Sequence, residues 1–430
     1  MIEFPTPRRL LKPTIASLTV LSSVLSTQAD PGKDTRGAIV DRHNKTIAHT
    51  SEGKRSYPLG KSAAHISGYV YTGKGTAGME ASQDQMLSTG KNVRLTIDSE
   101  LQKTCYDLLA AQKHPGSIVV QDPNTGEILA LVSYPSFDPS HFIPKISKEN
   151  WKNYQSNQQK PLLNRALFPH TPGSITMPLA ALAGEHAGLK NPEIHCKGFV
   201  VFGEIKIPDW KRNRDERLTI PEAIESSCGT YFMQLAARAD DQSMNTVGKL
   251  LHLNEINLNS LPAQASSWPW VPKDRPQHPS VLAMSAIGQG HSLITPVDAA
   301  TMTSAIATGT WHQPHLVVGE KKTKAPVDLT DSGKITSDSL QHIRHGMHLA
   351  VHGDQKTAGN ASVPGIQIAG IPSTAQTIHR GKRSRNCWFT GYGPYQKPQF
   401  TVTVFLSGAT SGGKSAAPIA SEVFTVLLKK

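Results

Sequence analysis

Cysteine is scarce in this chain of 430 residues, and its four cysteines are spread widely along the sequence. Such spacing fits neither a disulfide framework nor a zinc site, so we expect no metal and no cofactor. If the thiols did pair, three full pairings would be open, and the sequence does not choose among them. We therefore expect buried free thiols. The four positions are Cys105, Cys196, Cys228 and Cys387.

Signals for nucleic-acid binding are also missing, although the chain is basic. It has 45 Lys and Arg against 33 Asp and Glu, which gives a formal net charge of +12. A basic surface attracts nucleic acid, anionic lipid or acidic polymers. Here the charges are scattered, and there is no zinc-finger spacing, RNA-binding signature or aromatic-studded basic helix. We therefore expect no nucleic-acid partner.

Long apolar runs are absent except near the N-terminus, where one short run occurs. Arg8, Arg9 and Lys12 precede a mildly apolar stretch over residues 14–25, and small residues follow as far as Ala29. This order is typical of a signal peptide, and the run is too short to span a bilayer comfortably. We expect residues 1–29 to direct export, as a cleaved signal peptide or an uncleaved signal anchor.

The remaining sequence mixes strand and helix signals. Two apolar runs, 117–121 and 127–132, flank a Pro- and Gly-containing turn, which predicts a tight hairpin. Asp98 is a candidate cap for a helix that ends near Leu109. Residues 254–280 are rich in Pro, Ser, Asn and Trp and predict a long surface excursion. Further helices are expected at 172–187, 220–239, 296–308 and from 417 to the end, with strands at 366–369, 388–392 and 400–406. This mixture favours an α+β fold with an antiparallel sheet.

Ten short motifs occur in a fixed order from residue 36 towards the C-terminus. They are Arg36–Arg42, Leu95–Asp98, Asp122–Ala130, Tyr134–Pro139, Asn164–Ala166, Pro172–Ser174, Ser227–Phe232, Ile287–Gly290, Ser373–Gln376 and Trp388–Pro394. Through them the chain resembles the class B penicillin-binding proteins, the monofunctional transpeptidases of cell elongation and division. The resemblance covers the chain from residue 36 to its C-terminus.

The resemblance implies a penicillin-recognising serine transpeptidase fold, similar to β-lactamases, with an antiparallel sheet flanked by helices and a helical subdomain. Residues 98–430 would form the transpeptidase-like domain. Residues 30–97 would form a shortened N-terminal pedestal, because the family carries a much longer segment between the positions of Ala48 and Tyr57. Implied partners are peptidoglycan, other cell-wall synthesis proteins and, weakly, β-lactams. The implied location is the periplasm or the periplasmic face of the inner membrane, with the N-terminus near the membrane.

The family's first catalytic motif, S-x-x-K, is altered here to Ser174-Ile175-Thr176-Met177. In the family the serine forms an acyl-enzyme, and the lysine one helical turn away lies beside it and activates it. A serine hydroxyl is a poor nucleophile without such a base. The thioether of Met177 does not serve as one. The alternative without a catalytic role is that the Ser174 hydroxyl caps a helix.

The second motif, S-x-N in the family, is here Ser227-Cys228-Gly229. By resemblance, Ser227 takes the place of the proton-shuttling serine. Gly229 replaces the amide-bearing side chain and has nothing with which to hold a substrate carbonyl. An equally good interpretation is that Gly229 is a loop residue that needs a positive φ.

The third motif, K-T-G in the family, is the most changed. Here Ile371, Pro372 and Ser373 precede Thr374, whose amide could still complete an oxyanion hole. The resemblance assigns this strand to recognition of the substrate carboxylate, which isoleucine does not bind. Proline also removes a backbone donor and resists a central strand position.

Taken together, the three motifs predict a catalytically inactive pseudo-transpeptidase with vestigial Ser174 and Ser227 and a degenerate binding strand at Ile371, Ser373 and Thr374. Such a protein would act by binding peptidoglycan or cell-wall synthesis partners. Two alternatives stay open: a slow D,D-transpeptidase or hydrolase acylated at Ser174 by an unrecognised base, and a reversible sensor of stem peptides. Candidate substitute bases are His170 and Lys382, although Lys382 also fits an exposed basic hairpin tip.

Overall fold

The computed structural model describes residues 36–269, 279–379 and 381–429. The signal segment predicted over residues 1–29 lies outside these ranges. The described residues belong to one structural unit that starts at Thr35. None of the helices within them combines the length and the apolar character that a membrane crossing requires.

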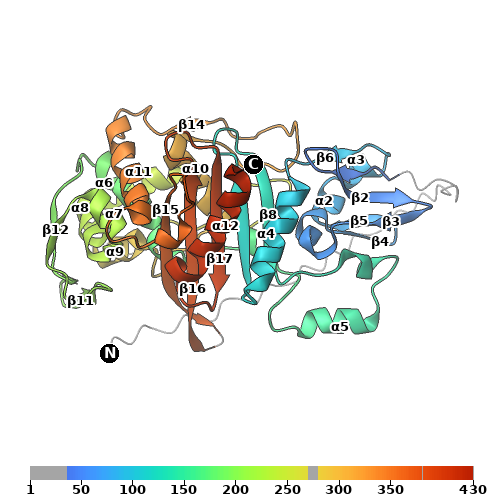
Figure 1. Ribbon diagram of the computed structural model, residues 1–430, viewed down its shortest axis with the longest axis horizontal. Coiled ribbons are helices and arrows are strands. Elements are labelled where there is room, and N and C mark those ends of the chain that lie inside the picture. The colour runs from blue at the N-terminus through green and yellow to red at the C-terminus, as the bar shows by residue number, and fades with distance from the viewer. Residues whose placement is uncertain (1–35, 270–278, 380, 430) are drawn as a thin grey trace. The chain divides into compact units, whose positions relative to one another are not determined.

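A five-stranded antiparallel sheet organises this unit (Figure 1). The strand order is β15 (Ala369–His379), β16 (Lys382–Gly393), β17 (Phe400–Ser407), β7 (Gly116–Gln121) and β8 (Ile128–Tyr134). The predicted hairpin joins β7 to β8. Strand β17 pairs with β7, with Val404 opposite Ile118, so the end of the chain completes a sheet that its first third begins. The predicted α+β class with an antiparallel sheet is confirmed.

Helices cover both faces of the sheet, and its strands are buried except towards the turn of the β15–β16 hairpin. The helices packed on the sheet include α4 (Ser99–Ala111), α10 (Pro296–Thr308) and α12 (Ala417–Leu428). Successive residues of β16 point to opposite faces. Cys387 and Phe389 pack in the apolar cluster with α4 and α12, whereas Trp388 and Tyr392 pack in the cluster that contains α10. The predicted cap is confirmed, because the Asp98 carboxylate accepts from the first backbone amides of α4.

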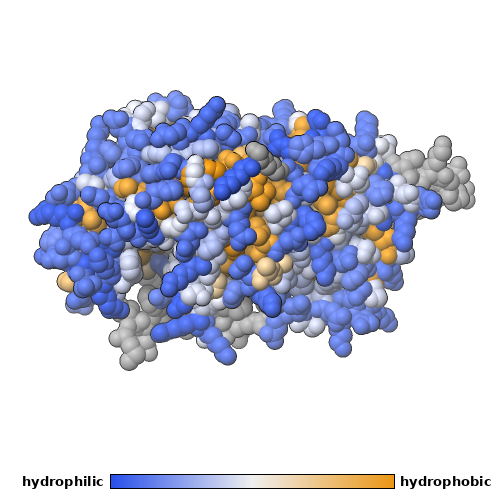
Figure 2. All heavy atoms as spheres, in the orientation of Figure 1, coloured by the Kyte–Doolittle hydropathy of each residue, from blue (hydrophilic) through white to orange (hydrophobic). Residues whose placement is uncertain are grey.

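Hydrophilic residues cover most of the face shown in Figure 2, and apolar residues gather mainly around α12. Side chains that are only partly buried against the α4–α12 cluster include Tyr106, Leu427 and Leu428. The closing helix α12 is therefore packed less completely than the sheet beneath it.

The helical subdomain packs against the β15 end of the sheet. Its helices are α6 (Met177–His186), α7 (Ile220–Glu225), α8 (Gly229–Leu250), α9 (Pro279–Ala286) and α11 (Ser337–His352). The single helix predicted over residues 220–239 is wrong: the chain breaks into α7 and α8 at residues 226–228. Ser227 lies in that break with a φ of 49°, a left-handed conformation that no helix interior allows. The break matters because Ser227 is a candidate catalytic residue.

The predicted surface excursion over residues 254–280 is also wrong for its described part. Trp268 is fully buried and its indole N–H donates to the Ser285 carbonyl at 2.9 Å. Leu258 and Leu261 are buried as well, in the cluster that joins the pedestal region to α10. The Pro- and Ser-rich composition here accompanies irregular backbone packed into the core, since irregular chain can be buried when its polar groups find partners.

The region before α4 is small and built around short strands. Its sheet order is β3 (Lys54–Ser56), β2 (Thr46–Ser51), β1 (Ile39–Val40) and β6 (Val93–Arg94). A short hairpin between β2 and β3 occupies the stretch where the resemblance predicts a missing segment. The other short elements of the chain are α1 (Ala64–Ser67), α2 (Gly78–Ser82), α3 (Asp84–Leu87), α5 (Lys148–Ser156), β4 (Tyr69–Tyr71), β5 (Lys74–Ala77), β13 (Thr310–Trp311) and β14 (Val327–Asp328).

A buried ion cluster fastens this region together. The carboxylate of Glu80 in α2 is fully buried and accepts from Arg36 Nε at 2.7 Å and Arg55 Nε at 2.6 Å. Tyr57 Oη donates to the same carboxylate at 3.2 Å. The segment before β1, the strand β3 and the helix α2 are thus joined through one carboxylate, because two buried guanidinium groups need its charge.

We predict that Glu80→Gln lowers the free energy of unfolding by about 3–5 kcal/mol, since it leaves buried Arg55 without its counter-charge and Arg36 with that of Asp84 alone. Urea unfolding followed by circular dichroism measures this. The matched control is Glu100→Gln, which breaks an exposed pair with Lys45 and should leave the stability nearly unchanged. Equal effects of the two substitutions would contradict the role given to Glu80.

Candidate functional site

Ser174 lies at the start of the helical subdomain, in a 3₁₀ turn over Gly173–Thr176 that leads directly into α6. The turn is pressed against β15. Gly173 has a φ of +61°, and a Cβ atom built on it would lie 2.2 Å from Ser373 Oγ. Only glycine fits this position, for both conformation and space. The turn therefore holds Ser174 in one place relative to the sheet.

The structure brings Ser174 and Ser227 together. Their hydroxyl oxygens lie 3.3 Å apart, within hydrogen-bond distance. Ser174 itself caps no helix, because Pro172 and Thr176 occupy the cap positions of the 3₁₀ turn and of α6. The capping interpretation of Ser174 is therefore wrong. Two of the predicted site residues form a hydroxyl pair at the junction of the turn and the α7–α8 break.

Met177 is the first residue of α6 and is 2% exposed. It belongs to the large apolar cluster of the subdomain, together with Ile175 and Leu179. Ile371 on β15 is fully buried in the same cluster. The two positions predicted to correspond to the family's lysines are thus both filled by apolar side chains of one continuous core.

The two candidate substitute bases have partners of their own or face solvent. The half-buried ring of His170 is stacked on Phe405 at 4.0 Å, and its Nε2 is 3.3 Å from the Arg165 carbonyl. Burial lowers the pKa of His170 to about 3. Lys382 is exposed at the first residue of β16, where the hairpin with β15 turns. The hydrogen bond of the Ser174 hydroxyl within the described residues is to Ser227.

Gly229 opens α8 and its φ is not positive, so the loop interpretation of this glycine is wrong. A Cβ atom built on it would meet Ile287, Met233 and Asp209 only at 3.7–3.8 Å, which is ordinary van der Waals contact. Neither conformation nor space requires glycine here. The absence of a polar side chain is therefore a property of the sequence that the fold does not impose.

The degenerate third motif lies on β15, an edge strand of the sheet. This location accommodates Pro372, which sits opposite Phe389 of β16. Ser373 is buried, and its hydroxyl donates to the Pro172 carbonyl at 2.8 Å, which closes the space between strand and turn. Thr374 is exposed, and its Oγ1 accepts from the Gly412 amide at 3.0 Å. No cation stands at Ile371 to receive a carboxylate.

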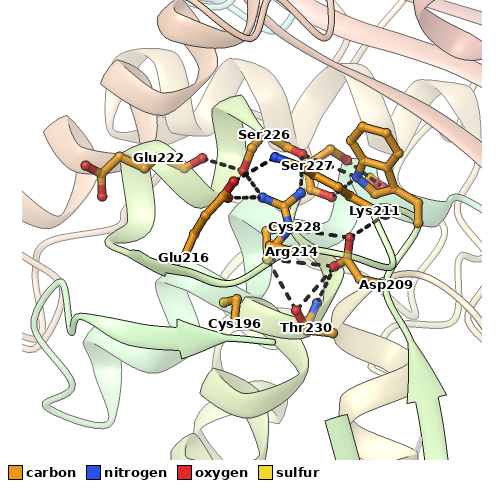
Figure 3. A network of polar contacts seen from close by, with 12 residues as sticks. Cys196, Asp209, Lys211, Arg214, Glu216, Glu222, Ser226, Ser227, Cys228 and Thr230 are labelled. Atoms are coloured by element: carbon orange, nitrogen blue, oxygen red, sulfur yellow. Dashed lines mark hydrogen bonds and ion pairs between the residues drawn. The ribbon is translucent and has the colours of Figure 1, made fainter. Parts of the chain in front are cut away.

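A polar network that the sequence analysis missed surrounds Ser227 (Figure 3). Arg214 is buried and donates to the Ser226 hydroxyl and carbonyl, both at 3.2 Å, and to Glu216 at 2.7 Å. Trp210 is 67% exposed, yet its indole N–H donates to the Ser227 carbonyl at 3.0 Å.

Asp209 completes the network by accepting from the Thr230 amide at 3.1 Å. A hydrogen bond from Lys211, with Arg214 nearby, lowers the pKa of Glu216. These contacts fix the α7–α8 break on both sides of Ser227. The polar run over residues 209–216 is the sequence signal that could have indicated this network.

Two further features of the described residues bear on ligands. An open cavity of about 430 Å³ lies between the pedestal region and the sheet domain, lined by Ala64, His65, Phe137, Leu167 and Leu261 among others. None of the three motif clusters lines it. Within the described ranges, no cluster of three or more His, Cys, Asp or Glu side chains is arranged to hold a metal ion.

Comparison with known families gives two matches. Residues 116–425 match the model described as the penicillin binding protein transpeptidase domain, and residues 36–119 match the penicillin binding protein A dimerisation domain. Among curated proteins, the peptidoglycan D,D-transpeptidase MrdA of Haemophilus influenzae is 27% identical over 373 residues, which are 79% of this chain and 57% of that protein. The chain therefore spans little more than half the length of the MrdA relatives it matches.

Solved structures agree with these matches. Pseudomonas aeruginosa PBP2, in complex with WCK 5153, has a TM-score of 0.82 and 29% identity over 92% of this chain and 96% of that one. Helicobacter pylori PBP2, in complex with MreC, has a TM-score of 0.81 at 21% identity, over 92% of this chain and 98% of that one. The expected penicillin-recognising transpeptidase fold is confirmed.

We predict opposite outcomes for two glycine substitutions at the site. Gly173→Ala should lower the free energy of unfolding by roughly 2–4 kcal/mol, because it adds left-handed strain and a clash with Ser373. Gly229→Ala should leave it unchanged or raise it by up to about 1 kcal/mol, since alanine is the better residue in a helix. Urea unfolding of both variants tests this. A large loss in Gly229→Ala would show that the fold does demand that glycine.

We also predict a pH dependence of stability that originates from His170. Its folded pKa lies well below its ordinary value of 6.5, so below pH 6.5 the unfolded chain binds a proton that the folded chain refuses. Stability is therefore lost as pH falls from 6.5 towards 3, by about 1.4 kcal/mol per pH unit for each such histidine. His170→Phe, which keeps the stacking, should show a shallower loss in urea unfolding between pH 6 and pH 4. The control His345→Gln, at an exposed site, should match the parent; identical slopes in all three proteins would refute the prediction.

Proposed function

This chain belongs to the family of penicillin-binding proteins with a transpeptidase domain, and we propose that it acts in cell-wall synthesis as a pseudo-transpeptidase. In this proposal it binds peptidoglycan or a cell-wall synthesis protein and does not turn substrate over. The observation that carries the proposal is the apolar character of both lysine positions. Met177 and Ile371 are members of one buried core, so neither position offers Ser174 a base or a carboxylate a cation.

The rate cost of these changes is large. Loss of a general base alone typically lowers a rate by about 10²- to 10⁴-fold. When nucleophile and base act as a unit, the loss approaches ~10⁶-fold. In this chain the amide position of the second motif and the carboxylate anchor of the third are missing as well. The remaining electrostatic help, from backbone amides near Ser174, is a remnant of the family's mechanism.

The framework around the site supports a binding role. Buried Arg214 and Asp209 still fix the break that carries Ser227, and the Gly173 turn still seats Ser174 against β15. A fold that keeps such contacts while its reactive groups are lost still offers a rigid surface for binding a partner. One solved protein of the same fold, H. pylori PBP2, forms a complex with MreC. We propose a protein partner of that kind, or peptidoglycan itself, for this chain.

The proposal includes export. Residues 1–29 carry the order of charges and apolar residues of a signal segment, which would place the protein in the periplasm or at the periplasmic face of the inner membrane. Residues 30–97 would then be the shortened pedestal and residues 98–430 the transpeptidase-like body. A weak, reversible affinity for β-lactams is compatible with this arrangement.

A second function is favoured by one observation. The hydroxyls of Ser174 and Ser227 lie 3.3 Å apart, and Ser174 is only partly buried. A pair of this kind is where a slow D,D-transpeptidase or hydrolase would be acylated if a base reached it. Its candidate bases, His170 and Lys382, would both have to move.

We predict that the purified chain forms no covalent adduct with a fluorescent penicillin. Without a base, Ser174 Oγ keeps its proton and does not open the β-lactam ring. The measurement is in-gel fluorescence after denaturation, with Ser174→Ala as the matched control and an active class B penicillin-binding protein as the positive control. Stoichiometric labelling that disappears in Ser174→Ala would overturn the proposal in favour of the slow enzyme.

A further inference from the structure

Two of the four thiols lie side by side, directly behind Ser227. Cys196 ends strand β9 (Ile194–Cys196), which pairs with β12 (Glu216–Leu218). Cys228 follows Ser227 and precedes the first residue of α8. Both side chains are fully buried in the same apolar cluster. Figure 3 shows the Cys196 side chain next to Cys228 and Thr230, at the base of the network that holds the break.

The surroundings of the two sulfurs favour reaction of one with the other. A hydrogen bond from the Cys228 thiol lowers the pKa of Cys196, with further help from Thr230 and the charge of Arg214. The hydrogen bond to Cys196 raises the pKa of Cys228. Cys228 Sγ is also 3.3 Å from Thr230 Oγ1 and 3.7 Å from Asp209 Oδ2. Cys196 is therefore the thiol that loses its proton more readily, and Cys228 lies next to it.

The remaining thiols stand in different surroundings. Cys105 on α4 and Cys387 on β16 are buried in the apolar cluster of the other sheet face. Burial raises the pKa of Cys387 to about 11 and raises that of Cys105 further still. No second thiol influences either of them, whereas Cys196 and Cys228 influence each other. The described residues thus hold one thiol pair and two single thiols.

We propose that Cys196 and Cys228 form an intramolecular disulfide when the chain meets a disulfide oxidant, and that Cys105 and Cys387 stay reduced. The Cys196 thiolate attacks a sulfur of the oxidant, forms a mixed disulfide and releases one thiolate. Once Cys196 is in the mixed disulfide, the interaction that most raises the pKa of Cys228 is gone. Cys228 then loses its proton, attacks Cys196 Sγ, forms the internal bond and releases the second thiolate. The two cysteine protons go to solvent, and the two electrons reduce the oxidant to two thiols.

The bond would act on the candidate site through the backbone. It would join the end of β9 to the residue that follows Ser227 and close the loop 197–227, which carries Trp210, Asp209 and Arg214. Fewer unfolded conformations of that loop would remain, so the oxidised form is expected to unfold at a higher temperature. The proposal holds whether or not Ser174 can be acylated, so its test and the penicillin test fail independently.

The test counts thiols in the purified chain. Reduced protein is incubated in glutathione buffers of rising oxidised-to-reduced ratio, quenched with acid, denatured and alkylated. A parallel sample is refolded from urea in the same buffers. It is needed because both sulfurs are buried and are exposed to glutathione only slowly in the native state. We expect two alkylated thiols and a linkage between the tryptic peptides that end at Lys197 and Arg238. Before alkylation, the mass should be lower than that of the reduced protein by the two lost hydrogens.

Variants separate this pairing from others. Cys105→Ala/Cys387→Ala keeps the pair and should lose both of its thiols on oxidation. Cys196→Ala and Cys228→Ala should each retain three alkylated thiols and form no internal bond. Four free thiols in both the native and the refolded samples would overturn the proposal. A linked peptide that contains Cys105 or Cys387 would overturn it too.

Discussion

The close fit between the Gly173 turn and strand β15 is the constraint on which the rest of the site depends. Gly173 has room for no side-chain atom, and the two residues before it are tied to the sheet. The Thr171 carbonyl accepts from the Trp388 indole at 3.0 Å, and the Pro172 carbonyl accepts from Ser373. These contacts hold the turn that leads into α6 against the edge strand. Ser174 therefore has a fixed position relative to β15. Catalytic relatives need that geometry, and a protein that only binds can inherit it intact.

Around this fixed point the site has changed its chemistry without changing its shape. Where charge is expected at the two lysine positions, the chain has Met177 and Ile371, and the apolar core has extended into both. The polar contacts that survive are structural: Arg214 donates to backbone and side-chain oxygens around Ser227, and Asp209 receives the first turn of α8. The residues that fix the backbone around Ser227 are thus different from the residues proposed to have lost their reactive groups.

Local signals predicted the elements whose ends are set by their own residues. Asp98 caps α4, and the helix predicted over residues 296–308 and the one starting at residue 417 match α10 and α12. The failures arose where distant partners decide. Ser227 adopts its left-handed conformation because Arg214 and Trp210 hold the flanking carbonyls, and no local pattern announces such support. Trp268 is buried because Ser285 accepts its indole N–H, whereas its own neighbours suggest an exposed loop.

The prediction of the candidate site also succeeded where the motifs alone decide and failed where distant contacts decide. Motif order alone brought Ser174, Ser227 and the β15 residues into one prediction, and the structure does place the two hydroxyls together. What the sequence did not reveal was whether each altered residue suits its surroundings. Gly229 looked like a backbone requirement and is not one, whereas Pro372 looked out of place in a strand and is accommodated at the sheet's edge.

The ion cluster at Glu80 has a mechanical consequence. Arg36, the first described residue, donates to Glu80 and also pairs with Asp84 at 2.8 Å. Glu80 belongs to α2 and Asp84 opens α3, so one guanidinium ties both short helices to the chain just before β1. A substitution that shifts either helix would therefore also release Arg36, and with it the start of the pedestal sheet.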